Sequence, residues 1–214
     1  MKTRNVLLMG IALLCAAAAF AQEPLQRVEV SVDYSYLRFN PQIPQLHSRS
    51  FNGGGGSISF NIAKMFAIKA EFMGYGSTNF NTTFTSAIVT PRGAIPSGTY
   101  NSQGNMFTYL FGPVVKFPVS KVEPFGEILF GGSNSNGYAN LTRSIAAGGG
   151  TIGVSPTQHP FTMAVGGGFD LNVSHHVALR PLEIDYVLTR YSNPITFINN
   201  QNNFRYIAGI TFKF

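Results

Sequence analysis

Apolar and polar side chains alternate along most of this chain. In residues 28–36, valine or tyrosine occupies every second position, and serine, glutamate or aspartate occupies each position between them. Side chains of a β-strand repeat their direction every two residues, whereas an amphipathic helix needs a spacing of about 3.6 residues. No segment sustains the helical spacing, so the sequence predicts an all-β protein.

Eight segments show this alternation, and each is predicted to form a strand. They are residues 28–36, 57–62, 66–72, 106–117, 122–131, 161–173, 177–191 and 204–214. The seventh segment has one irregularity, because Arg180 shares the parity of the apolar residues unless Pro181 marks a β-bulge. Eight strands are the favoured prediction, and ten are the alternative.

The links between the predicted strands are short and long in turn. Those at residues 63–65, 118–121 and 174–176 are tight, and the others are long and polar, above all 77–102 and 132–160. An even number of antiparallel strands with short turns at one end and long loops at the other is the topology of outer-membrane β-barrels. In such a barrel the turns and both termini face the periplasm, and the loops face outward.

The composition favours a membrane barrel over a soluble β-protein. Only 11% of the residues are charged, against about 25% in ordinary soluble proteins. A soluble β-sandwich or lipocalin also alternates, but its polar face meets water and should be rich in charge. Here the polar face is mostly Ser, Thr, Asn and Gly, and the apolar face is rich in Phe and Tyr. The sequence therefore predicts a single antiparallel transmembrane β-barrel over residues 22–214.

The N-terminal segment has the features of a cleaved secretory signal peptide. Lys2 and Arg4 precede an apolar run over residues 6–20, which ends in the small-residue pattern Ala-Phe-Ala. A transmembrane helix is the alternative, but it needs about 20 apolar residues. We predict a signal peptide over residues 1–21, cut before Gln22. Its removal takes away Cys15, the single cysteine, so the mature chain has no disulfide and no thiol chemistry.

The charged residues of the polar parity should point into the barrel. The interior of an eight-stranded barrel is just wide enough to be filled by side chains, which disfavours a wide pore. The spacing of Glu183 and Asp185 places both on one face, where paired carboxylates also suit acid/base catalysis; filling of the lumen is the favoured interpretation. The predicted lumen ionic network consists of Glu29, Asp33, Lys69, Glu71, Glu123, Glu127, Asp170, Glu183, Asp185, Arg205 and Lys213.

The last nine residues, Tyr-Ile-Ala-Gly-Ile-Thr-Phe-Lys-Phe, complete the pattern. With the alternating strands and the signal peptide, they resemble the small bacterial outer-membrane β-barrel domain family, whose barrels are of the outer-membrane protein A and X type. The resemblance covers the whole mature chain. It implies that Tyr206, Gly209, Phe212 and Phe214 form the signal read by the outer-membrane assembly machinery, although Ile207 stands where that signal more often has a polar residue. Related proteins often carry a periplasmic peptidoglycan-binding domain after the barrel, and none is expected after Phe214.

Several other functions are disfavoured. Removal of Lys2 and Arg4 lowers the formal charge from +6 to +4, and no run of Lys or Arg is present to bind nucleic acid. The glycine clusters at 53–56, 148–150 and 166–168 lack the Lys-Ser or Lys-Thr of a phosphate-binding loop. The four histidines are not placed with a nucleophile or with further metal ligands; they are His47, His159, His175 and His176. We expect no catalytic residues, no cofactor and no metal.

The remaining functional candidates are the long external loops, because loops on a rigid scaffold often carry binding sites. The expected protein is a non-catalytic barrel in the outer membrane of a Gram-negative bacterium, with a structural or surface-interaction role. Its expected partners are outer-membrane lipid, lipopolysaccharide and the assembly machinery, and its surface ligand is open. A small porin-like solute channel is the alternative, and a lipid-modifying enzyme is a third hypothesis.

Overall fold

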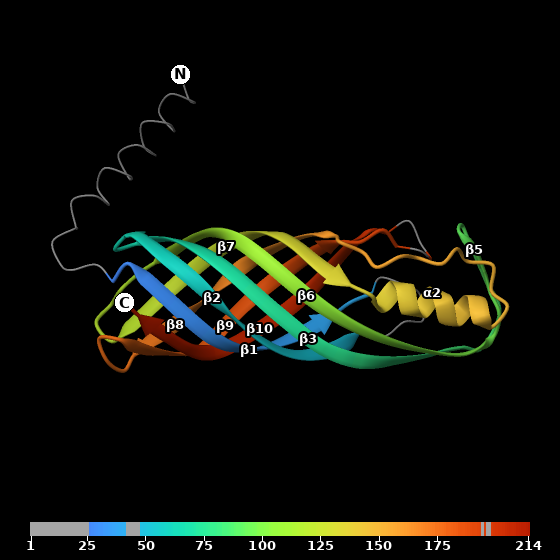
Figure 1. Ribbon diagram of the computed structural model, residues 1–214, viewed down its shortest axis with the longest axis horizontal. Helices are drawn as coiled ribbons and strands as arrows, with labels where there is room; N and C mark the ends of the chain where they lie inside the picture. Colours follow the sequence, from blue (N-terminus) through green and yellow to red (C-terminus); the bar gives the residue numbers. More distant parts are fainter. Residues whose placement is uncertain (1–25, 42–47, 194, 196–197) are drawn as a thin grey trace, which may run out of the picture.

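The computed structural model of the chain describes residues 26–41, 48–193, 195 and 198–214. Eight strands form one closed antiparallel barrel (Figure 1). They are β1 Val28–Phe39, β2 Arg49–Ala63, β3 Phe66–Phe84, β6 Gly98–Lys116, β7 Val122–Ser135, β8 Phe161–Asn172, β9 Val177–Arg190 and β10 Asn200–Lys213. The other elements are a small hairpin and one helix: β4 Ile88–Thr90, β5 Gly93–Ile95 and α2 Gly137–Ala147. The predicted signal peptide over residues 1–21 lies outside the described residues, as does His47.

The first and last strands close the barrel. β1 pairs antiparallel with β10, with Glu29 opposite Lys213. The Phe214 amide donates a hydrogen bond of 2.8 Å to the Val28 carbonyl. The order around the barrel is β1-β10-β9-β8-β7-β6-β3-β2. Closure pairs the backbone groups of the wall with one another, and the prediction of eight barrel strands is confirmed.

The two ends of the barrel differ as predicted. The short links after β2, β6 and β8 lie at one end, together with β1's beginning and β10's end (Figure 1). The long links lie at the other end, where α2 and the β4–β5 hairpin extend the molecule beyond the barrel (Figure 1). We call these the turn end and the loop end. Any ligand of the long links therefore binds at the loop end.

Residues 77–102, predicted to be a loop, contain much more strand than expected. After an irregularity between Tyr75 and Thr78, β3 continues its pairing with β6 as far as Phe84 opposite Gly98. The prediction of an irregular loop is therefore wrong over most of this range. Residues 77–83 are almost entirely Ser, Thr and Asn, so they offer no alternation to detect, and the pairing depends on backbone hydrogen bonds rather than on an apolar face.

Residues 132–160, also predicted to be a loop, contain the helix α2. The fold class is all-β as predicted, but this element was missed. Four of its buried residues, Tyr138, Leu141, Thr142 and Ile145, follow the spacing i, i+3, i+4, i+7 of one helical face. The signal was present over too few residues to stand out. No described helix is both long enough and apolar enough to cross a membrane.

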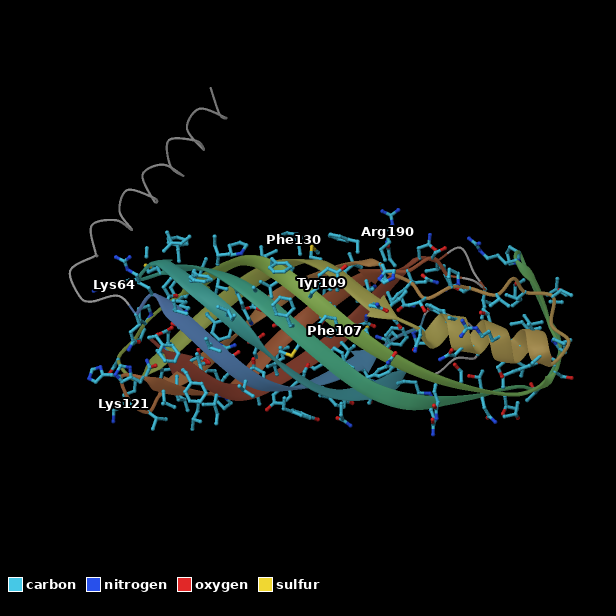
Figure 2. All side chains as sticks on the ribbon, in the orientation of Figure 1. Lys64, Phe107, Tyr109, Lys121, Phe130 and Arg190 are labelled. Carbon is cyan, nitrogen blue, oxygen red and sulfur yellow. The ribbon has the colours of Figure 1, made fainter. Side chains whose placement is uncertain are left out.

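The wall has a polar inner face and an apolar outer face. In β1, Ser31 and Asp33 are 4% and 5% exposed, whereas Val32 between them is 63% exposed. Figure 2 shows Phe107 and Phe130 along the outside of the barrel, and both are 45% exposed. This distribution is the reverse of a soluble β-protein, whose apolar side chains face its core. The outer face therefore suits contact with hydrocarbon.

Pro181 lies at a bulge in β9. On the β10 side, Glu183 faces Ile207 but Arg180 faces Gly209, so β9 uses one residue more than its neighbour. The pairing of β9 with β8 shows the same extra residue. The bulge returns Arg180 to the interior, where it is 6% exposed. The hypothesis of a bulge at Pro181 is thus confirmed, and the register of this strand is settled.

Candidate functional site

The middle of the barrel interior is crossed by an ion-pair network centred on Lys69. Its ammonium nitrogen lies 3.0 Å from Glu127, 3.2 Å from Glu183 and 3.2 Å from Glu71. These groups come from β3, β7 and β9, which are not neighbours in the barrel wall. The network therefore spans the lumen and connects opposite walls.

Two arginines extend this network. The Arg205 guanidinium lies 2.7 Å from Asp185 and also donates to Glu71, which it shares with Lys69. The Arg180 guanidinium donates to both carboxylate oxygens of Asp170, at 2.8 and 3.0 Å, and lies 3.0 Å from Glu183. Buried charges need such pairing and such hydrogen bonds, because desolvation of an unpaired charge is costly.

A second group of charges lies near the turn end. Lys116 lies 2.5 Å from Glu29 and 3.5 Å from Glu123. Lys213 lies 3.1 Å from Glu123 and donates to the Asn172 side chain at 2.8 Å. Lys116 and Arg180 belong to these ion pairs but are not among the residues that the sequence predicts for the lumen network. Lys116 alternates with apolar residues of its strand, and this position on the polar face could have predicted its place inside the barrel. The position of Arg180 could not, because the bulge at Pro181 changes the face on which it lies.

All the residues of the predicted lumen network are buried inside the barrel, and ten of the eleven form ion pairs. The eleventh, Asp33, accepts a hydrogen bond from Ser31. Its Oδ1 lies against Gly209, where an added Cβ would stand 2.1 Å from that oxygen. Gly166 makes the same room for Asp185. These two glycines therefore leave space in the wall for a carboxylate of the adjacent strand.

The glutamates around Lys69 are the one described group with the composition of a metal site. Ligand oxygens of Glu71, Glu127 and Glu183 lie within 4.8 Å of one another. Lys69 contacts all three, however, and supplies the positive charge that a cation would bring. The geometry therefore fits an internal ion-pair network better than a metal centre.

Apolar side chains, interspersed with buried hydroxyl and amide side chains, fill the interior on the loop side of most of the charges. All eight barrel strands contribute to two buried clusters. Along β1, β3, β6, β7, β8 and β9, these side chains lie nearer the loop end than the network residues of the same strand; β10 is the exception. We call the two clusters the apolar layer, which consists of Leu37, Phe51, Met73, Tyr75, Met106, Ile207, Leu110, Leu129, Ala164 and Val187.

Helix α2 caps the loop end. The Tyr138 hydroxyl donates to the Pro41 carbonyl at 3.0 Å and accepts a hydrogen bond from the Gln201 side chain. Burial raises the pKa of Tyr138, so the phenol stays neutral. The cap has a small core of its own, made of Phe84, Ile95, Tyr100, Tyr138, Leu141, Ile145, Ile152, Tyr191 and Ile195.

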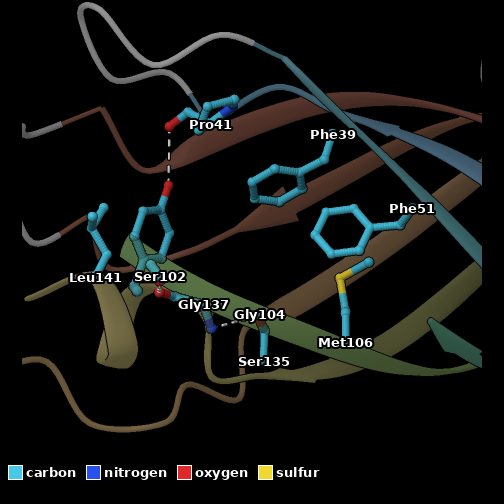
Figure 3. A pocket seen from close by; sticks show the side chains of 10 residues that line it. Phe39, Pro41, Phe51, Ser102, Gly104, Met106, Ser135, Gly137 and Leu141 are labelled. Atoms are coloured by element: carbon cyan, nitrogen blue, oxygen red, sulfur yellow. Dashed lines mark hydrogen bonds between the residues drawn. The ribbon is translucent and has the colours of Figure 1, made fainter. Parts of the chain in front are cut away.

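A narrow apolar slot remains between the cap and the barrel mouth (Figure 3). Phe39, Phe51 and Met106 line it from the barrel side, and Tyr138 and Leu141 line it from α2. The space in it open to a water-sized sphere is about 30 Å³. An apolar cavity of this size gives a water molecule few hydrogen-bond partners. The slot therefore continues the apolar layer rather than opening a passage.

Charges are divided unequally between the inside and the outside. Every Asp and Glu side chain of the described residues is buried in the barrel. Basic residues also lie at both ends, and Figure 2 shows Lys64 and Lys121 at the turn end and Arg190 toward the loop end. The loop-end set consists of Arg38, Arg49, Arg92, Arg143 and Arg190. The described part of the loop end thus carries basic side chains and no acidic ones.

Three residues of the predicted assembly signal lie in β10, and the fourth, Phe214, follows directly after it. Phe212 and Phe214 are 40% and 68% exposed on the outer face, and Tyr206 donates to the Pro181 carbonyl at 2.8 Å. Gly209 is the residue that makes room for Asp33. The structure shows their positions, and their role in assembly stays a prediction.

The described histidines fall into two separate groups. His175 and His176 lie in the β8–β9 turn, where the His176 ring nitrogen Nδ1 is 3.1 Å from the Lys213 carbonyl oxygen. His159 lies at the loop end, just before β8. The two groups therefore lie at opposite ends of the barrel and do not form one site.

Comparison with known proteins supports the fold and gives no close relative in sequence. No protein-family model matches the chain, and no curated protein matches its sequence. Neisserial surface protein A (NspA) superposes with a TM-score of 0.58 at 13% identity, covering 87% of this chain and 97% of that one. The chain folds as a small outer-membrane β-barrel. At such an identity the likeness establishes the fold alone.

Other small outer-membrane barrels resemble this one. Ail, the attachment invasion locus protein of Yersinia pestis, was solved in complex with the heparin analogue sucrose octasulfate; it superposes with a TM-score of 0.50 at 11% identity, covering 88% of this chain and 98% of Ail. The N-terminal β-barrel domain of Pseudomonas aeruginosa OprF gives a TM-score of 0.48 at 11% identity, with 87% and 97% covered.

Proposed function

We propose that this protein is a non-catalytic barrel of the Gram-negative outer membrane, with a structural or surface-interaction role carried by its loop end. One observation carries the proposal: charges and apolar side chains fill the interior, while the long links build an ordered cap. The accessible functional surface is then the outside of the cap. Lipopolysaccharide and outer-membrane lipid surround the wall, and the assembly machinery inserts it.

The filled interior is the argument against the alternative of a small solute channel. An ion that moved along the barrel would have to pass the apolar layer, where the few polar groups are hydroxyls such as those of Ser35 and Thr108, which replace little of its hydration shell. Transfer of an unpaired ion into such surroundings is very unfavourable. The ion pairs around Lys69 also join non-neighbouring strands and block the middle of the lumen.

The placement of the histidines supports the non-catalytic proposal. A hydrolytic site needs a nucleophile, a base and a third orienting group within hydrogen-bond reach of one another. His175 and His176 belong to the turn end, and His159 stands apart from them at the loop end. The buried carboxylates around Lys69 are held in ion pairs and are closed off from substrate by the apolar layer.

The charge distribution points to anionic surface ligands. The loop end carries Arg38, Arg143 and Arg190, with no described Asp or Glu outside the barrel. Arginine binds phosphate and sulfate groups through its planar fork of donors. The complex of Ail with a heparin analogue concerns a barrel of the same fold and is consistent with this ligand class.

Conductance and binding measurements test the proposal. The mature chain, refolded and inserted in a planar bilayer, should give no steady conductance. A steady conductance that changes in Lys69→Gln or Glu127→Gln would show a water path through the lumen and contradict the proposal.

Binding to immobilised heparin and to lipopolysaccharide should weaken as salt rises. The triple variant Arg38→Gln/Arg143→Gln/Arg190→Gln should bind several-fold more weakly than the wild type. The matched control is Lys64→Gln/Lys121→Gln, which removes charge at the turn end and should leave binding unchanged. Equal losses in both variants would mean that overall charge, and not the loop end, determines binding.

A further inference from the structure

The loop end contains an open cavity of about 460 Å³. Its lining includes Arg92, in the turn of the β4–β5 hairpin, and shares no residue with the lining of the slot under α2. Its volume falls in the range of roughly 300–1,000 Å³ that is typical of small-molecule sites. The lining residues are Arg92, Gly153, Val154, Ser155, Pro156 and Ser192.

Three segments far apart in the sequence build this cavity, and hydrogen bonds hold them together. The Gln158 side chain donates to Ser155 Oγ at 2.9 Å and to the Ser192 carbonyl at 2.8 Å, and it accepts from the Ser192 amide at 2.9 Å. On the hairpin side, the Thr151 amide donates to the Ala94 carbonyl at 3.0 Å, and Thr151 Oγ1 accepts from the Ala94 amide at 2.9 Å. The walls are thus fixed relative to one another without a ligand.

Further contacts anchor the cavity to the cap. The Ser155 amide donates to Thr142 Oγ1 of α2 at 2.9 Å, and Thr142 is fully buried. Within the hairpin turn, the Arg92 amide donates to Thr90 Oγ1 at 3.2 Å, and Thr90 Oγ1 donates to the Gly93 carbonyl at 2.8 Å. A site whose walls are already ordered loses little conformational entropy when a ligand binds.

The chemistry of the lining is that of a site for an acidic sugar. Arg92 supplies a guanidinium, whose fork matches a carboxylate, phosphate or sulfate. The exposed Ser192 hydroxyl can exchange hydrogen bonds with a sugar hydroxyl, whereas the buried Ser155 hydroxyl already accepts from Gln158 and donates to the Pro156 carbonyl. Val154 is 55% exposed and, with Pro156, offers an apolar surface for the C–H face of the ring. The described Asp and Glu side chains are all inside the barrel, so none of them repels an anion here.

We propose that this cavity binds one acidic sugar residue of a glycan, with Arg92 holding its acidic group and the Ser155–Pro156 wall holding the ring. The proposal rests on the proposed surface-binding function and names the ligand class of one site within it. Lipopolysaccharide and foreign glycans both carry such acidic groups, and the chemistry of recognition is the same for the two sources.

The test is a titration of the refolded mature barrel in detergent micelles, followed by ligand-observed saturation-transfer NMR. The probes are glucose 6-sulfate, glucose 6-phosphate and glucuronate, with glucose as the uncharged control. At least one acidic sugar should bind with an affinity about tenfold or more above that of glucose, because charged hydrogen bonds are stronger than neutral ones. The preferred acid group then identifies the source: sulfate indicates a foreign sulfated glycan, and phosphate indicates lipopolysaccharide.

Variants locate the binding. Arg92→Gln should lower the affinity about tenfold or more and remove the preference for acidic sugars, whereas Arg92→Lys should retain part of it. Lys121→Gln is the matched control, because Lys121 is an exposed cation of the turn end, outside the cavity. Val154→Asp places a carboxylate beside Arg92 at an exposed position and should abolish binding without unfolding the cap.

Equal binding of glucose and all three acids, no effect of Arg92→Gln, or an equal loss in Lys121→Gln would each overturn the proposed site. These outcomes leave the proposed function standing if the loop-end triple variant still weakens heparin or lipopolysaccharide binding. A steady bilayer conductance would instead contradict the proposed function, independently of the results of the sugar titrations.

Discussion

The Lys69 ammonium lies 3.0 Å from the Glu127 carboxylate, although 58 residues separate them and their strands are not neighbours. This ion pair spans the lumen, and Lys69 also contacts two further glutamates. Removal of the cation would leave three buried carboxylates close together. The interior should therefore be sensitive to substitution of Lys69.

Lys69→Met should destabilise the barrel by about 3–5 kcal/mol, because a buried pair that loses one partner leaves an uncompensated charge. Urea unfolding in lipid vesicles measures the change. Lys64→Met, in the β2–β3 turn, is the control and should change stability by less than about 0.5 kcal/mol. Lys69→Met/Glu127→Gln should lose less than the sum of the two single variants. Additive losses would show that the two residues do not interact.

Deletion of Pro181 should impair folding far more than its substitution by alanine. The deletion removes the bulge residue, so the residues before it in β9 shift by one position. Arg180 then points toward lipid, where an arginine is unfavourable by roughly 2–4 kcal/mol at the midplane, and Asp170 loses its partner. Heat-dependent gel mobility reports the folded fraction. Efficient refolding of the deletion variant would argue against this register.

Ile128→Lys tests whether the outer face contacts lipid. Ile128 lies near the middle of β7 and is 44% exposed. In a bilayer the lysine should destabilise the barrel by about 2–4 kcal/mol. Val89→Lys is the control, because Val89 is 86% exposed on the hairpin beyond the barrel and should tolerate the charge. A neutral effect at both positions would be expected of a water-exposed wall and would contradict the membrane assignment.

The cap should lose stability at alkaline pH, because the phenol of Tyr138 is buried in it. Burial raises its pKa above the ordinary value of 10.0. A tyrosine in an opened cap ionises at about 10, so the closed cap has its full stability below that pH and loses it as pH rises further. The difference in tyrosinate absorbance between wild type and Tyr138→Phe should therefore titrate above pH 10. A difference that titrates at the ordinary value would show an exposed phenol.

Phe214→Ala should separate assembly in cells from folding in the test tube. The Phe214 side chain is 68% exposed, and its backbone groups already pair with Val28. Refolding in detergent should therefore be nearly unchanged, whereas insertion into the outer membrane of cells should fall several-fold if the assembly machinery reads this residue. Gel mobility of purified and of cell-derived protein measures the two effects. Unchanged insertion in cells would remove Phe214 from the assembly signal.

The sequence by itself determined the wall of the barrel. Strict alternation in segments such as residues 28–36 gave the inner and outer faces, because the period of a strand is fixed by backbone geometry. Glu127 and Lys69 alternate with apolar residues in their strands, and this position was enough to place both side chains inside the barrel. The alternation of short and long links then specified the antiparallel order and the two ends.

Only the tertiary structure decided which charges meet and what the long links build. Lys69 contacts Glu127 and Glu183 because barrel closure brings non-neighbouring strands together, and no local pattern encodes that distance. Arg180 faces inward because a bulge adds one residue. Helix α2 exists because Tyr138 and Ile145 find a buried surface at the barrel mouth, and a helix this short depends on packing more than on its intrinsic propensity.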